Sequence, residues 1–236
     1  MSADESQRGA LSIGEYLIST RSFEEYRAMF GLTDDDLAGR LLDCPGGGSS
    51  FTATAAARGI DAVAVDPVYA TLPERLSDRL DHELARGTRW AEANADRYVW
   101  DFYGDVAGHA RVQADSGRLF TRDLARHPGR YVAAALPSLP FPGDAVDLVL
   151  SSHLLFTYAD RLDADFHLAA VQEMLRVGRR EVRIHPLVDQ AGRPLPGLVD
   201  RLVAALTRSG VHAAIEPVDY EFQRGATSML RIRRPQ

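Results

Sequence analysis

Residues 41–50 read LLDCPGGGSS, in which a short apolar run ends in an acid and three consecutive glycines follow. Glycine loses more conformational freedom on folding than any other residue, so three in a row need a geometric reason. The candidate reasons are a tight turn, a ligand held against the backbone, or a flexible linker. The sequence on either side of the glycines decides between them.

The flanking sequence predicts a strand, a turn, a helix and a second strand. Residues 40–44 (RLLDC) predict a short buried strand. Residues 49–59 (SSFTATAAARG) predict a helix that a serine caps and Gly59 ends. Residues 61–66 (DAVAVD) predict another apolar strand, which again ends in an acid. Because a flexible linker does not fit between a buried strand and a capped helix, the glycines form the turn of a βαβ unit.

The rest of the chain continues this pattern around one long helical stretch. A capping box formed by Ser22 and Glu25 predicts a helix in the first part of the chain. Residues 70–130 predict a mostly helical insertion, in which residues 104–129 form short helical pieces. Strands and helices then alternate to the C-terminus, and the last two strands have no helix between them.

These elements predict the fold class and the domain organisation. Alternating strands and helices indicate an α/β protein with a doubly wound, mostly parallel sheet of seven strands, helices on both faces and an antiparallel last strand. The expected strands cover residues 40–44, 61–66, 130–135, 145–152, 180–185, 212–218 and 227–233. We expect a single domain over residues 1–236, with an N-terminal helical lid over residues 1–38 and the helical insertion at about 70–130.

Composition and charge exclude several classes of function. The formal net charge of −6 argues against a broad phosphate-binding surface, so no nucleic-acid partner is expected. Lysine is absent, and its absence removes Schiff-base chemistry, a P-loop lysine and a lysine general base. The single cysteine excludes an intramolecular disulfide and a cysteine-based zinc site, and we expect no bound metal.

The sequence shows neither a secretory signal pattern nor a membrane-spanning run. The first ten residues, MSADESQRGA, lack a basic-then-apolar signal pattern, and no apolar run reaches the length of a membrane-spanning helix. We therefore expect a cytoplasmic protein that does not interact with membranes.

The glycine turn follows the first strand, which is where open parallel sheets bind their ligands. A dinucleotide-binding G-x-G-x-x-G turn needs a further glycine at position 51 or 50, but these positions hold Phe51 and Ser50. A P-loop needs a lysine, and the chain has none. The sequence therefore favours neither a nicotinamide oxidoreductase nor a P-loop nucleotidase.

The turn resembles the first motif of the class I S-adenosylmethionine (SAM)-dependent methyltransferases, a strand that ends in Asp/Glu-x-Gly-x-Gly-x-Gly. Asp43 and Gly47 match this motif, whereas Pro45 and Ser49 stand where glycines are usual. Residues 139–156 (LPFPGDAVDLVLSSHLLF) closely resemble the proline-rich turn and fourth strand of the same superfamily. The resemblance covers residues from about 40 to 68 and from about 130 to the C-terminus, and it is typical of small bacterial members.

The resemblance implies SAM as the cofactor and assigns its contacts. Asp43 would lie near the SAM amino group, and Asp66 would accept hydrogen bonds from the ribose hydroxyls. Ala135 stands where family members often carry an acid that reads the adenine amino group, so backbone groups and packing would recognise the adenine here. The implied cofactor-binding residues are Asp43, Pro45, Gly46, Gly47, Asp66, Pro67, Ala135, Leu136 and Ser152, with Val68 and His153 beside them.

The implied reaction is methyl transfer from SAM to an O, N or C nucleophile of a small molecule. His153 is the candidate general base, with Tyr158 and His185 behind it, and a base is needed only for an unactivated nucleophile. The aromatic residues between positions 90 and 103 either line an aromatic substrate pocket or form a satellite core. A non-catalytic SAM- or nucleoside-binding protein and a methyltransferase acting on RNA or protein stay open, and a homodimer is compatible with the sequence.

Overall fold

Seven strands form one sheet in the computed structural model, which describes residues 16–234. The strand order is β3-β2-β1-β4-β5-β7-β6, in which β1 to β5 pair in parallel and β7 is antiparallel to both of its neighbours. This arrangement confirms the predicted fold class. The strands are β1 (Leu41–Asp43), β2 (Ala62–Val65), β3 (Tyr131–Val132), β4 (Val146–Ser152), β5 (Gly178–His185), β6 (His212–Pro217) and β7 (Ser228–Arg233).

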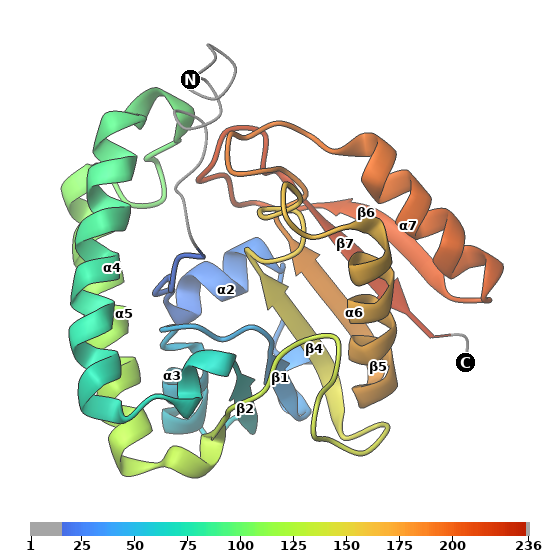
Figure 1. Cartoon of the computed structure of the whole chain (residues 1–236), viewed down its shortest axis with the longest axis horizontal. Helices are drawn as coiled ribbons and strands as arrows, with labels where there is room; N and C mark the ends of the chain where they lie inside the picture. The colour runs from blue at the N-terminus through green and yellow to red at the C-terminus, as the bar shows by residue number, and fades with distance from the viewer. Residues whose placement is uncertain (1–15, 235–236) are drawn as a thin grey trace.

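Helices cover both faces of this sheet (Figure 1). Side chains alternate along β1, so Leu42 packs in the cluster that includes helices α6 and α7, whereas Leu41 packs with α2 and α3 on the other face. A third apolar cluster holds α4 and α5 against the sheet at Ala64. The helices are α2 (Phe23–Met29), α3 (Phe51–Ala57), α4 (Pro73–Ala93), α5 (Val106–Arg126), α6 (Ala164–Val177) and α7 (Pro196–Arg208).

The predicted capping box of α2 and the glycine stop of α3 are present, whereas the N-cap Ser50 of α3 makes no side-chain capping hydrogen bond. The Ser22 side chain accepts a hydrogen bond from the Glu25 amide, and the Glu25 carboxylate accepts one from the Ser22 amide, which completes the capping box of α2. Gly59 follows α3 with a φ of +77°, the left-handed conformation that ends a helix. The part of the predicted N-terminal lid before residue 16 lies outside the described residues.

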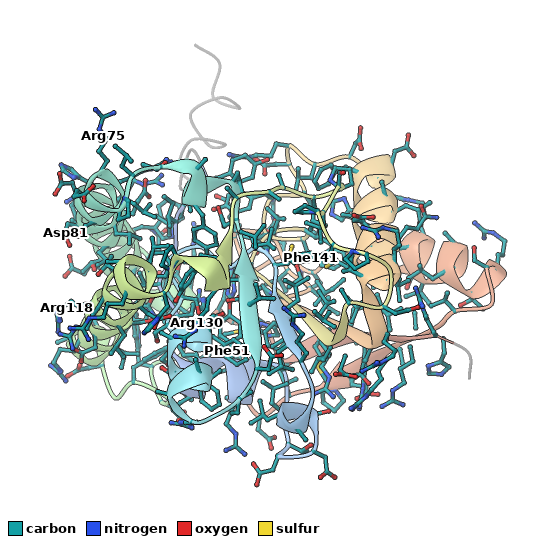
Figure 2. All side chains as sticks on the ribbon, turned by 90° about the horizontal axis from the view of Figure 1, so that it is seen from below. Phe51, Arg75, Asp81, Arg118, Arg130 and Phe141 are labelled. Carbon is teal, nitrogen blue, oxygen red and sulfur yellow. The ribbon has the colours of Figure 1, made fainter. Side chains whose placement is uncertain are left out.

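The insertion between β2 and β3 consists mainly of the long helices α4 and α5, which pack against each other (Figure 1). The prediction of several short pieces over residues 104–129 is wrong, because α5 runs unbroken through Gly117. A Cβ on Gly117 would lie 3.2 Å from Thr20 Cγ2, so this glycine allows the N-terminal segment to approach the helix. Figure 2 shows Arg75, Asp81 and Arg118 on the outer side of this helix pair and Phe51 inside the protein.

Strand β3 is shorter than predicted. Only Tyr131 and Val132 pair with β2, whereas residues 130–135 were expected to form a strand. Ala135 instead forms an isolated bridge with Ser138 at the beginning of the proline-rich turn. Among residues 16–234, no helix is both long and apolar enough to cross a bilayer.

Candidate functional site

A cavity of about 520 Å³, here called the outer cavity, lies at the carboxyl ends of β1, β2 and β4. The predicted site residues in its walls come from the glycine turn, the turn after β2, the segment after β3, and the end of β4 with the residues that follow it, and residues 16–21 contribute as well. Of the predicted site residues, the outer cavity is lined by Pro45, Gly46, Gly47, Asp66, Pro67, Val68, Ala135, Leu136, Ser152, Tyr158 and His153. The structure therefore brings together most of the residues that the resemblance to the methyltransferases selected.

Asp43 lies behind the glycine turn and is not part of the cavity wall. It is 1 % exposed, and its Oδ1 accepts a hydrogen bond of 2.7 Å from the Tyr26 hydroxyl. Its Oδ2 is buried and has no hydrogen-bond partner among the described residues. Burial raises the pKa of this carboxyl well above its usual value, so an ionised Asp43 requires a donor or a cation nearby.

Asp66 joins the turn after β1 to the turn after β2. Its Oδ2 accepts a hydrogen bond from the Gly47 amide and its Oδ1 accepts one from the Val68 amide, each at 2.9 Å. Burial raises the pKa of Asp66 despite these bonds. Each carboxylate oxygen can accept a second hydrogen bond. Asp66 therefore fixes both turns and keeps acceptor capacity in the wall of the outer cavity.

The protein's own packing explains two of the three glycines. A Cβ on Gly46 would lie 2.5 Å from the Tyr69 hydroxyl, and a Cβ on Gly48 would lie 2.6 Å from Leu80 Cδ2. Gly47 has a φ of +51°, which glycine adopts far more readily than residues with a side chain. A ligand is therefore not needed to explain the missing side chains at Gly46 and Gly48.

Residues 16–21 cross the glycine turn and separate the outer cavity from a second one. The Gly48 amide donates a 3.0 Å hydrogen bond to the Ser19 carbonyl, and the Ser50 amide donates one of 2.9 Å to the Arg21 carbonyl. The Leu17 amide donates a 2.8 Å hydrogen bond to the Tyr158 hydroxyl. These bonds hold residues 16–21 against the glycine turn and Tyr158.

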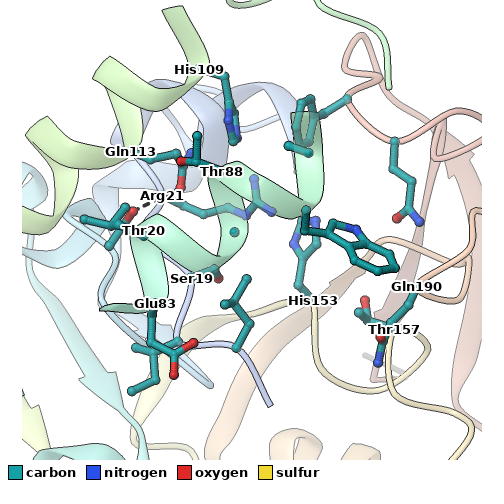
Figure 3. A pocket seen from close by; sticks show the side chains of 18 of the residues that line it. Ser19, Thr20, Arg21, Glu83, Thr88, His109, Gln113, His153, Thr157 and Gln190 are labelled. Carbon is teal, nitrogen blue, oxygen red and sulfur yellow. Dashed lines mark hydrogen bonds between the residues drawn. The ribbon is translucent and has the colours of Figure 1, made fainter. Parts of the chain in front are cut away.

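The second cavity, here called the inner cavity, has a volume of about 130 Å³ and is drawn in Figure 3. Helix α4 forms one wall with Gly87, Thr88 and Trp90, and α5 contributes His109 and Gln113. Arg21, His153 and Tyr158 line both cavities. The two cavities therefore meet at these residues.

His153 occupies the junction of the two cavities in a strained conformation. Its φ of +51° is uncommon for a residue with a side chain, and such strain concentrates at functional sites. Its Nδ1 lies 2.7 Å from the Ser152 hydroxyl oxygen, and that hydroxyl donates to the Met29 sulfur at 3.6 Å. We assign the proton to Nδ1 on this basis, which leaves Nε2 as an acceptor.

The electrostatic surroundings keep His153 neutral. Burial lowers its pKa well below the usual 6.5, and the charges of Arg21 and His185 lower it further. His185 lines neither cavity; its Nε2 donates a 3.1 Å hydrogen bond to the Ala226 carbonyl, and burial lowers its pKa to about 4. Burial raises the pKa of Tyr158. Of the three candidate bases, only His153 and Tyr158 line the cavities among the described residues.

A buried polar network beneath the inner cavity was missed in the sequence. Glu25 is fully buried, and its Oε1 accepts hydrogen bonds from Arg21 at 3.1 Å, from the Tyr103 hydroxyl at 2.6 Å and from Gln113 at 3.0 Å. Its Oε2 accepts one from the Ser22 amide. Glu25 was identified as part of a capping box, but no sequence pattern marks Arg21, Tyr103 and Gln113 as its partners.

Comparisons with known proteins yield distant similarities. No protein-family model matches the chain. A Methanocaldococcus jannaschii protein described as uncharacterized is 27% identical over 225 residues, which cover 95% of this chain and 99% of that protein.

Solved structures similar to the chain include three methyltransferases. Magnesium protoporphyrin IX methyltransferase from Synechocystis PCC 6803, solved with SAM, has a TM-score of 0.46 and 11% identity over 86% of this chain and 73% of its own. Mitomycin 7-O-methyltransferase has a TM-score of 0.48 and 14% identity, and the match covers 90% of this chain and 54% of that protein. A Bacteroides fragilis SAM-dependent methyltransferase in complex with S-adenosyl-L-homocysteine has a TM-score of 0.47 and 10% identity, and the match covers 97% of this chain and 81% of that protein. At this distance, function must come from the residues of the two cavities.

Proposed function

We propose that the outer cavity binds SAM and that the protein transfers its methyl group to a small-molecule acceptor. One observation carries the proposal: every residue that the resemblance assigned to the cofactor, except Asp43, lines a single cavity although the residues come from four separate stretches of the chain.

The residues of the outer cavity fit SAM in size and chemistry. A volume of about 520 Å³ lies within the range of roughly 300–1,000 Å³ that is usual for ligand sites. Asp66 keeps acceptor sites for the ribose hydroxyls, and Val68 and Leu136 supply apolar surface for the adenine. Asp43 Oδ2, which is buried and has no hydrogen-bond partner among residues 16–234, lies behind the turn on which the methionine moiety would rest, and the positive charge of its ammonium group would favour an ionised Asp43.

The protein's own contribution is alignment, exclusion of water and a position for one proton. When bound, SAM supplies a methyl group on a positively charged sulfur, which is already a strong electrophile. Residues 16–21 cover the site, and the junction of the two cavities fixes where an acceptor meets the methyl group. His153 Nε2 accepts the proton of an acceptor that does not ionise by itself.

Removing the Asp66 carboxylate tests the assignment of the cofactor site. The Asp66→Ala variant is expected to bind SAM more weakly by about 1.5–3 kcal/mol, the range for hydrogen bonds to a charged group, which raises the dissociation constant roughly 10- to 150-fold. Isothermal titration calorimetry measures this change. Asp66→Asn keeps one acceptor oxygen and should lose less affinity.

Asp61 at the opposite end of β2 provides the matched control, since its side chain is 67% exposed and pairs with Arg40. Asp61→Ala should bind SAM as the wild type does. Equal affinity of wild type and Asp66→Ala would reject Asp66 as a cofactor contact.

A second experiment identifies the class of methyl acceptor. When the protein is incubated with methyl-labelled SAM and a metabolite extract, the label is expected in small molecules. Label in RNA or protein would favour a methyltransferase that acts on macromolecules, and SAM binding without any labelled product would favour a non-catalytic SAM-binding protein.

A further inference from the structure

The inner cavity has the size and walls of a site for one flat ring. An engineered cavity of about 150 Å³ admits benzene, so a space of about 130 Å³ accommodates a molecule of similar size. Aromatic side chains form much of its surface and pack against one another. The Phe222 ring stacks on His109 at a centroid distance of 4.5 Å and on Tyr98 at 4.6 Å. The Trp90 indole donates a 2.9 Å hydrogen bond to the Tyr98 hydroxyl, which fixes a third wall.

The polar groups of this cavity have an excess of hydrogen-bond donors. Arg21 Nε is buried and lacks a partner among the described residues, as do Thr157 Oγ1 and His109 Nδ1. The guanidinium nitrogen can only donate, and the other two atoms are able to donate. In Figure 3 the Arg21 side chain reaches into the space between His109 and His153. Buried donors without acceptors are unfavourable, so a ligand that brings oxygen atoms into this cavity would be stabilised by these groups.

Neither carboxylate beside the inner cavity supplies these oxygen atoms. Glu83 lines the cavity but accepts a hydrogen bond of 3.1 Å from Arg86 Nε. Glu25 already accepts bonds from four donors, and only one of these comes from Arg21. His109 adds no charge, because burial and the nearby Arg21 lower its pKa to about 3.

We infer that the inner cavity binds the methyl acceptor and selects a single-ring molecule that carries an oxyanion, such as a carboxylate, for Arg21. This inference rests on the proposed function of the outer cavity, because it names the substrate class of that reaction. The acceptor's ring lies among Trp90, Tyr98 and Phe222, and its reactive group lies beside His153, which lines both cavities.

Two matched probes test the selectivity: 4-hydroxybenzoate and 4-hydroxybenzamide, which differ only in the charged group. Binding is measured by calorimetry and by quenching of tryptophan fluorescence, with and without saturating S-adenosyl-L-homocysteine. The wild type is expected to bind 4-hydroxybenzoate at least about tenfold more tightly, because charge-assisted hydrogen bonds are roughly twice as strong as neutral ones.

Two variants locate the binding. Gly87 lies in α4 at the cavity wall, and a Cβ there would meet only Leu17 Cδ2 at 3.6 Å, so Gly87→Leu fills the cavity without a backbone clash. It should abolish probe binding and leave the affinity for S-adenosyl-L-homocysteine within about threefold of wild type. Arg21→Lys keeps a cation for Glu25 but lacks the Nε donor, so it should lose the preference for the benzoate. Arg27→Lys, at an exposed pair with Asp34, is its control and should retain it.

The outcomes separate this inference from the proposed function. Equal binding of the two probes, no binding at millimolar concentration, or full binding by Gly87→Leu would overturn the inference even if S-adenosyl-L-homocysteine binds normally. Selective probe binding that Gly87→Leu removes, in a protein that never binds S-adenosyl-L-homocysteine, would support the inner site as an oxyanion site and reject the SAM proposal together with the acceptor role.

Discussion

The His153→Ala variant is expected to lose methyl transfer by a factor of roughly 10²–10⁴ in kcat, the usual contribution of a general base. His153 Nε2 is free to accept a proton, and the side chain lines both cavities. The comparison uses single-turnover rates with an acceptor whose nucleophile is protonated at neutral pH. Since His153 also borders the outer cavity, SAM affinity is measured separately and should change by less than about tenfold.

The pH profile gives a second check on His153. Because burial, Arg21 and His185 lower its pKa well below 6.5, the imidazole is neutral at pH 7 and stays so on mild acidification. The wild-type rate should therefore be flat around neutral pH and fall only in more acidic solution, as His153 becomes protonated. His212→Ala, at an exposed position of β6, is the matched control. Equal kcat values for wild type and His153→Ala with that acceptor would contradict the role as a base.

The Glu25→Ala variant is expected to lose about 3–5 kcal/mol of unfolding free energy, the usual effect of removing one partner of a buried ion pair. Alanine leaves the Arg21 guanidinium, the Tyr103 hydroxyl and the Gln113 amide without their shared acceptor. It also removes half of the capping box of α2. Urea-induced unfolding measures the difference.

Glu24 on the same helix provides the control for Glu25. It pairs with Arg58 at the surface, where the two side chains are 59% and 46% exposed, so Glu24→Ala should change stability by at most about 1 kcal/mol. Glu25→Gln keeps the shape of the side chain and one acceptor oxygen, so its unfolding free energy should lie between those of the two alanine variants. If Glu25→Ala is no less stable than Glu24→Ala, the buried network does not fix Arg21 as described.

Local patterns were sufficient to predict the fold, and the resemblance to the methyltransferases selected most of the residues that share the outer cavity. The apolar strands that end in Asp43 and Asp66, with a capped helix between them, predicted the βαβ unit. Parallel pairing then brings the ends of β1, β2 and β4 to one edge of the sheet, so residues adjacent to these ends in sequence line one cavity.

Contacts between distant segments could not be predicted in the same way. Tyr69 and Leu80 occupy the space that side chains at positions 46 and 48 would need. Both residues are distant from the turn in sequence, so no local pattern connects them to it. Arg21 and Gln113 reach the same acceptor, Glu25, because residues 16–21 pack between the glycine turn and α5, where the Ser116 hydroxyl donates to the Arg21 carbonyl at 2.6 Å. The inner cavity depends on this packing, so no motif in the sequence indicated it.

The binding site of the cofactor is tested most directly by a crystal structure of the wild-type protein with S-adenosyl-L-homocysteine. We predict electron density in the outer cavity, with the ribose hydroxyls within hydrogen-bonding distance of Asp66 and the adenine between Val68 and Leu136. Density for the compound at any other place on the protein, with the outer cavity filled only by solvent, would contradict the proposal that this cavity is where the methyl donor binds.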